Sequence, residues 1–164
     1  MNLPPLKSTD VSIGYSGIEL VNESEITSHQ IGYSVTSDGE SLIGNGAENW
    51  KANWVVIGHE TGCGDPIFID SNRPDYPVYT AMHGSGSWEP KIICRTYDSF
   101  IRIIEKLEKL AAGREYPTRL EEKPMTQTEY DEFLSFVMEN AEIEDTHFWG
   151  LMISDDNAGI GPEI

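Results

Sequence analysis

Four side chains in the middle of the chain could carry acid–base chemistry: His59, Asp65, Asp70 and His83. Paired carboxylates can divide the roles of general acid and general base, and an imidazole can exchange a proton near neutral pH. An Asp at a turn, however, commonly accepts hydrogen bonds from nearby backbone N–H groups and fixes where a strand begins. Because no nucleophile, electrophile or metal completes the set, we expect turn roles for these residues, no catalytic residue and no enzymatic activity.

The glycine-rich segment 58–64 matches neither the dinucleotide fingerprint nor the P-loop. No Lys-Ser or Lys-Thr pair follows it, and the next element is predicted to be a strand. Its glycines suit a tight turn with positive φ. His59, Cys63, His83 and Cys94 lack the closely spaced Cys or His pairs of zinc sites, so we expect no metal and no cofactor. Two cysteines are too few for a disulfide framework, which favours free thiols in a reducing cytosol.

Short apolar runs separated by Gly, Pro, Asn and Ser predict the strands that must position these residues. The expected strands are 17–21, 31–35, several within 53–79, and 88–95. The Pro-rich residues 1–10 are predicted to form a loop or an edge, and residues 36–52 a loop or a weak hairpin. The strand–turn–strand block around Gly62 and Gly64 holds most of the candidate residues.

Helices are predicted in the last third of the chain. Apolar residues recur at three- and four-residue spacing over 100–111, which indicates one buried helix face. Asp98 or Ser99 can cap the start of this helix, and Gly113 can end it.

A capping box, Thr126 with Glu129, predicts the start of a second helix, and 145–152 is a shorter third candidate. Residues 157–164 are expected to be a frayed tail. Strands first and helices later, without regular alternation, predict an α+β fold with one domain over 1–164. The sheet should be mainly antiparallel and twisted, with the C-terminal helices packed on one face.

The 164-residue chain has a formal net charge of −17 and a pI near 4.4. Such a surface repels nucleic acid and anionic lipid and attracts basic partners. Residues 121–164 hold twelve Asp and Glu against the single Lys123. The N-terminus lacks a charged region followed by an apolar one, and no apolar run is long enough to span a bilayer, so we expect a cytoplasmic protein without membrane contact.

One spaced pattern covers about residues 50–105. Its recurring elements are Trp54, Gly58, Gly64, Asp65, Pro66, Phe68, Asp70, Pro77, Val78, Tyr79 and the helix start Ser99 and Phe100. This pattern resembles the core of the SUKH superfamily, which includes bacterial immunity proteins against polymorphic toxins and the Smi/Knr domain of fungal cell-wall regulators. Members usually open with an amphipathic helix and a Leu-Pro element before the first strand. Here Leu3-Pro4 is present, but no helix is predicted before it. The resemblance implies an α+β binding domain whose matched residues are structural.

In bacteria the resemblance further implies an immunity protein that binds and blocks a cognate toxin, often a nuclease. Because the chain is acidic, the expected partner is a basic protein domain. The acids expected to face it are Glu129, Asp131, Glu132, Glu142, Glu144 and Asp145, with Trp88 and Tyr76 as aromatic anchors. Two alternatives remain: a regulatory scaffold of the cell-wall-assembly type, and an enzyme, which would need His59, Asp65, Asp70 and His83 to converge in one deep pocket.

Overall fold

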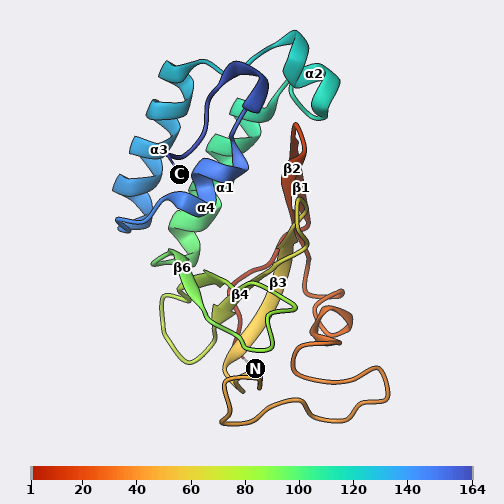
Figure 1. Ribbon diagram of the computed structural model, residues 1–164. Helices are drawn as coiled ribbons and strands as arrows, with labels where there is room; N and C mark the ends of the chain where they lie inside the picture. Colours follow the sequence, from red (N-terminus) through yellow and green to blue (C-terminus); the bar gives the residue numbers. More distant parts are fainter. Residues whose placement is uncertain (1, 164) are drawn as a thin grey trace.

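Six strands form one antiparallel sheet in the computed structural model, which describes residues 2–163 (Figure 1). Their order in the sheet follows their order in the chain, so each strand pairs with the one before it. The strands are β1 Thr9–Ile13, β2 Ser16–Leu20, β3 Trp54–Glu60, β4 Pro66–Asp70, β5 Val78–Thr80 and β6 Lys91–Cys94.

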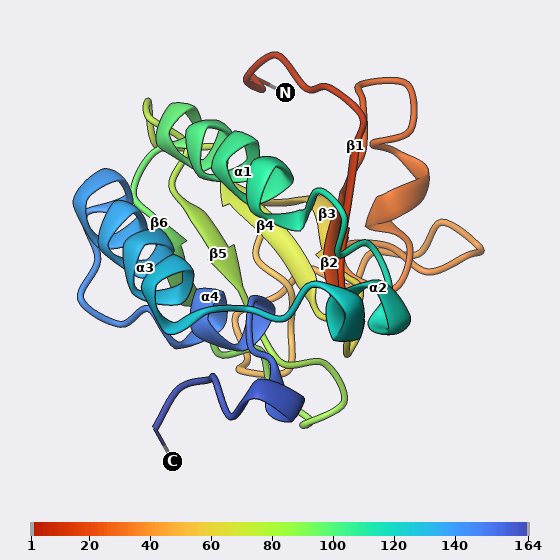
Figure 2. The ribbon, with the colours of Figure 1, turned by 90° about the horizontal axis from the view of Figure 1, so that it is seen from above.

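The helices are α1 Tyr97–Ala111, α2 Pro117–Glu122, α3 Gln127–Ala141 and α4 His147–Met152, with short 3-10 turns at Ser28–Gln30 and Asp156–Ala158. Seen from above, α1, α3 and α4 lie across one face of the sheet (Figure 2). The predicted α+β fold is therefore confirmed, with the C-terminal helices on one face. Within residues 2–163, no helix combines the length and the apolar composition that a membrane crossing requires.

The main core lies between the helices and the sheet. Alternate side chains of a strand point to opposite faces, and in β4 Ile67 and Ile69 face the helices. Phe100 of α1, Phe133 of α3 and Trp149 of α4 pack against this face and are buried. The Trp149 indole N–H also donates a hydrogen bond to the backbone carbonyl of β6 at 3.0 Å. This bond ties α4 to the last strand.

The opposite face of the sheet is covered by a loop. Phe68 of β4 points away from the helices and is buried against an aromatic cluster. The cluster consists of Tyr33, Trp50, Trp54, Phe68, Tyr79 and Trp88. Trp50 lies at its centre, with its ring 4.8 Å from Phe68 and about as close to the rings of Tyr33, Trp54 and Trp88. The segment 21–53, which carries Tyr33 and Trp50, therefore provides the second covering layer (Figure 1).

The predicted glycine-rich turn joins β3 to β4. Gly64 has a φ of +82°, which a residue with a side chain rarely adopts. The Glu60 carboxylate accepts hydrogen bonds from the backbone N–H groups of Gly62, Cys63 and Asp65. Gly58 sits at a bulge in the β3–β4 register, where a Cβ would lie 2.2 Å from a backbone oxygen of β2. These contacts explain why the turn needs its glycines and its acidic residue.

Both long helices begin at a threonine cap. The Thr126–Glu129 capping box is present in full and starts α3, as predicted. For α1 the predicted caps were wrong. Thr96 is the N-cap and its hydroxyl accepts from the Ser99 N–H, while Asp98 lies inside the first turn. An acid there still interacts favourably with the helix dipole.

Residues 9–13 form strand β1 at the edge of the sheet, in line with the loop or edge expected over residues 1–10, and the edge continues to Ile13. Two other elements differ from the sequence prediction. Residues 31–35 make only isolated bridges, because this part of the chain wraps over the aromatic cluster. Residues 117–122 form α2, where no helix was predicted, since Pro117 at the first helical position already has a helix-compatible φ.

The expected frayed tail 157–164 packs at least as far as Ile160. That side chain is buried, and its backbone exchanges two hydrogen bonds with Asp155. Gly150 within α4 is explained by Tyr130, whose hydroxyl lies 2.8 Å from where a Cβ would be.

A buried arginine joins the ends of α1 and α3. Arg114 is 2% exposed and donates hydrogen bonds to three backbone carbonyls, those of Leu110, Lys123 and Pro124. Its remaining bond goes to the Glu129 carboxylate at 2.7 Å. A buried guanidinium is costly without a counter-charge. Glu129 supplies that counter-charge and therefore stabilises the folded protein.

Replacing the central aromatic of the loop-covered face is expected to destabilise the whole protein. Trp50→Ala should lower the free energy of unfolding by about 3–5 kcal/mol, because it leaves a cavity under four rings. Urea denaturation followed by circular dichroism measures this. Tyr15→Ala, at a ring that is 78% exposed, is the control and should change stability by less than about 0.5 kcal/mol. Equal effects of the two changes would contradict a structural role for Trp50.

Neutralising the partner of Arg114 should weaken the fold in a pH-dependent way. The Arg114 hydrogen bond lowers the pKa of Glu129 in the folded protein below the ordinary value of 4.5. The contribution of the ionised Glu129 side chain to the free energy of unfolding is therefore complete above the ordinary pKa of 4.5. It is lost as the pH falls through the lower pKa of the folded protein. Glu129→Gln should cost about 1–2 kcal/mol at pH 7, less than for a fully buried pair because the Glu129 side chain is 35% exposed.

The difference between Glu129→Gln and wild type should shrink as the pH is lowered below 4.5, in urea titrations at several pH values. Glu132→Gln, at an exposed acid on the same helix, is the matched control. A constant difference at all pH values would show that the charge of Glu129 does not stabilise the fold.

Candidate functional site

Two hollows meet at the connection between α3 and α4. The first, of about 640 Å³, lies between α3, α4 and the C-terminal segment, and we call it the α3–α4 hollow. The second, of about 630 Å³, lies between α4, strand β6 and the loop 81–90, and we call it the β6–α4 groove. Asp145 and His147 line both. Together the two make a continuous candidate docking surface on one side of the molecule.

The α3–α4 hollow is acidic. It is lined by the side chains of Asp131 on α3, Glu144 and Asp145 in the connection, and Glu163 near the C-terminus, and its lining contains no Lys or Arg. The connection turns sharply at Glu142, whose φ is +53°. This turn ends α3 and brings the two acids that follow it beside Asp131. Among the described residues, only Asp145 of these four acids approaches a cation.

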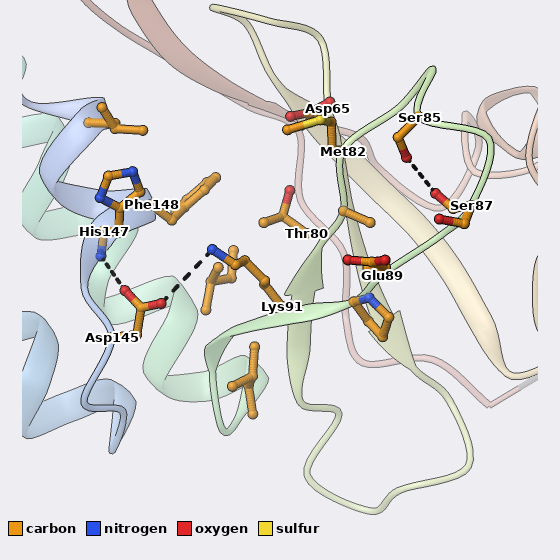
Figure 3. A pocket seen from close by; sticks show the side chains of 15 residues that line it. Asp65, Thr80, Met82, Ser85, Ser87, Glu89, Lys91, Asp145, His147 and Phe148 are labelled. Carbon is orange, nitrogen blue, oxygen red and sulfur yellow. Dashed lines mark hydrogen bonds and ion pairs between the residues drawn. The ribbon is translucent and has the colours of Figure 1, made fainter. Parts of the chain in front are cut away.

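The β6–α4 groove has apolar walls with charged groups around them (Figure 3). Ile92 and Phe148 are half-buried in it, whereas Met82 is 68% exposed and Leu151 is 49% exposed. Lys91 of β6 reaches towards Asp145, with the two charged atoms 4.0 Å apart. This ion pair spans the groove from the sheet to the helical layer.

Three acids surround the groove: Asp65, Glu89 and Asp145. Asp65 is held in place by the loop 81–90, because His83 donates its backbone N–H at 2.9 Å and its Nδ1 lies 2.6 Å from the same carboxylate oxygen. The Asp145 carboxylate accepts the backbone N–H of His147 at 2.9 Å, at the start of α4. These backbone contacts fix the positions of two negative charges on opposite sides of the groove.

The structure brings together three of the acids predicted to face a partner, namely Asp131, Glu144 and Asp145. Glu132 is exposed on α3, outside the lining of this hollow, and Glu142 lies beside a separate depression near Arg95. Glu129 was assigned wrongly. It is committed to the ion pair with Arg114 described above and is not a free surface charge.

The two predicted aromatic anchors, Trp88 and Tyr76, are also not free at the surface. Trp88 is half-buried, with its ring 5.1 Å from that of Trp50 and 5.6 Å from that of Tyr33. Tyr76 is half-buried against the main core and has a φ of +49°. A Trp that follows a Gly-Ser turn looked exposed because the sequence does not show that segment 21–53 packs over it.

The four candidate acid–base residues fall into three separate hydrogen-bonded groups. Asp65 pairs with His83 at the groove. His59 Nε2 lies 2.9 Å from the Tyr33 hydroxyl. Asp70, at the other end of β4, accepts from the Asn53 side chain at 2.7 Å and from a backbone N–H in the following turn. Asp65 and Asp70 therefore do not form a pair of carboxylates that could share acid–base work.

The pKa values near the aromatic cluster reflect its burial. Desolvation is the main cause that lowers the pKa of His59, with the neighbouring His29 adding to it. Desolvation also raises the pKa of the Tyr33 phenol, and the negative charge of Asp65 acts in the same direction. Both shifts favour the neutral forms of the two side chains, in keeping with their position at the edge of an aromatic cluster.

The two cysteines differ in exposure. Cys63 is exposed in the β3–β4 turn, whereas Cys94 is buried and its pKa is raised to about 11 by desolvation. Within residues 2–163, no three His, Cys, Asp or Glu side chains are grouped so that they could hold a metal ion.

The residues of the spaced sequence pattern have packing or turn roles. Buried members are Gly58, Pro66, Phe68, Pro77, Val78, Ser99 and Phe100. Trp54 and Tyr79 are half-buried in the aromatic cluster, and Gly64 provides the positive φ of the turn. Each of these positions shapes the sheet or the start of α1, away from the acidic hollow.

Sequence reasoning missed the exposed apolar residues of the groove, Met82 and Leu151. A signal for each was present. Met82 is an isolated apolar residue before a Gly-Ser loop, and Leu151 lies off the inward face defined by Phe148, Trp149 and Met152. Neither signal shows that the two residues border the same groove. They do so because α4 packs beside β6 in the folded protein.

The chain matches no family model, no curated protein and no solved structure. The similarity of its spaced pattern to the SUKH superfamily therefore stays a prediction from the sequence. The function must therefore be inferred from the shape, the charge and the exposed apolar side chains of the α3–α4 hollow and the β6–α4 groove.

Proposed function

We propose that this protein is a non-enzymatic binding protein of the immunity type, which neutralises a basic toxin domain by covering its active surface. The observation that carries this proposal is the α3–α4 hollow, in which four acids surround a concave surface without a lining Lys or Arg. A concave region of one charge sign raises the local concentration of oppositely charged partners and speeds their association.

Electrostatic complementarity supports the choice of a basic partner. Enzymes that act on nucleic acid present basic surfaces to the phosphate backbone, and an acidic protein can compete for those surfaces. The net charge of −17 would also steer such a partner over longer distances at low salt. Inhibition would follow from steric and electrostatic occlusion, without a chemical step.

The test is binding between the purified chain and the toxin domain encoded beside its gene, by calorimetry at low and high salt. We expect nanomolar affinity that weakens as salt increases, because exposed charges are screened. Combining Asp131→Asn, Glu144→Gln and Glu163→Gln should weaken binding by about 10–100-fold at low salt and reduce the salt dependence.

The matched control combines Asp38→Asn, Glu40→Gln and Glu48→Gln, which remove the same charge from exposed positions in the segment that covers the other face of the sheet. It should change affinity by less than about threefold. Equal losses in the two triple variants would show that only net charge matters. Absence of binding by the wild-type chain at both salt concentrations would reject the toxin domain as the partner.

A further inference from the structure

The β6–α4 groove contains apolar surface that the fold leaves exposed. Met82 in the loop 81–90 is 68% exposed and Leu151 on α4 is 49% exposed, and both border the groove. Ile92 and Phe148 also line the groove and add to its apolar surface. Apolar side chains gathered in one concave site, with polar residues around them, are typical of a binding site.

The charged residues that line the groove favour some kinds of binding segment over others. Asp65, Glu89 and Asp145 border it, and Lys91 is the one Lys or Arg among its lining residues. An acidic segment would bring like charges together, and a neutral polar segment could donate hydrogen bonds to these carboxylates without neutralising them. A segment with a Lys or Arg could pair with them while its apolar neighbours cover Met82 and Leu151.

The Lys91–Asp145 ion pair occupies the place where such a cation would bind. Its charged atoms are 4.0 Å apart, and the side chains are 67% and 69% exposed, so the pair contributes little to stability. A guanidinium from a partner can make two parallel hydrogen bonds to a carboxylate, which Lys91 cannot do. Lys91 is therefore an internal competitor that an incoming cation would displace.

We propose that the β6–α4 groove is the docking site for a segment of the basic partner in which apolar side chains lie next to Lys or Arg. The apolar side chains cover Met82 and Leu151, and the cation replaces Lys91 at Asp145. This proposal rests on the function proposed above and assigns the anchoring contact to a surface next to the α3–α4 hollow.

Two other occupants fit less well. A second copy of this chain would bring another surface of the same charge sign into contact with Asp65, Glu89 and Asp145, and like charges repel. A small ligand would leave Met82 and Leu151 exposed at the border, because sites for small molecules usually enclose most of the ligand. The groove volume of about 630 Å³ leaves room for several adjacent side chains of a peptide segment.

The first test uses three synthetic peptides of equal length and methyl NMR of the full chain. One peptide combines Lys and Arg with Leu and Phe, the second replaces Leu and Phe by Ser, and the third replaces Lys and Arg by Glu. We expect only the first to shift the methyl signals of Met82, Leu151 and Ile92 in a saturable way. Unmoved signals at about 1 mM of the first peptide, or equal shifts with the first two, would overturn the proposal.

The second test measures affinity for the first peptide in single variants. Asp145→Asn should weaken binding more than fivefold, and Met82→Ser and Leu151→Ser should each weaken it more than threefold. Ile43→Ser, at an apolar residue that is 44% exposed elsewhere, is the control and should have no effect. Lys91→Ala should tighten binding more than twofold relative to Lys7→Ala, which removes the same charge from the N-terminal segment. No difference between these two lysine variants would show that Lys91 does not compete.

Repeating the single variants with the toxin domain separates this proposal from the proposed function. If the triple acid variant loses affinity while Met82→Ser and Leu151→Ser do not, the toxin binds the acidic surface but not the groove. If the toxin domain does not bind and the first peptide still shifts the groove signals, the groove is a docking site for a different basic partner. A chain that only self-associates, measured by sedimentation, would contradict both.

Discussion

Strand β4 must be covered on both faces, and the rest of the structure follows from this requirement. Ile67 and Ile69 need the helices on one side, whereas Phe68 needs the aromatic cluster on the other. Because Trp50 lies at the centre of that cluster, a long segment with little regular structure is held in a defined position. Both sides of the sheet are thereby occupied, and the candidate docking surface lies at the border between the sheet and the helical layer.

The parts of the fold with a local signal could be predicted from the sequence. The capping box at Thr126 and the apolar spacing over 100–111 gave α3 and α1, because both depend on residues a few positions apart. The segment 31–35 looked like a strand since apolar residues occupy every second position, but its conformation is set by contact with Trp50 and β3. Local pattern cannot show that a long loop, and not a helix, covers the second face of a sheet.

The sequence predicted that acidic residues of the C-terminal third would form the candidate site, but it did not predict the hollow or the groove that they line. Counting acids identified the C-terminal third, and Asp131, Glu144 and Asp145 do lie around one hollow. The same count included Glu129, whose pairing with Arg114 depends on the ends of two helices meeting. The apolar part of the surface was missed, because Met82 and Leu151 become neighbours of one groove only when α4 lies beside β6.

The strand order bears on the sequence in which the parts of the protein form during synthesis. Each strand pairs with the preceding one, so much of the sheet forms from contacts that are close along the chain, which favours rapid folding. Asp145, α4 and the C-terminal segment follow all six strands in the sequence. On the ribosome they emerge after all six strands, so the sheet is expected to form before the proposed inhibitory surface exists. A partially synthesised chain that ends before Asp145 would thus contain all six strands but not the surface that we propose for partner binding.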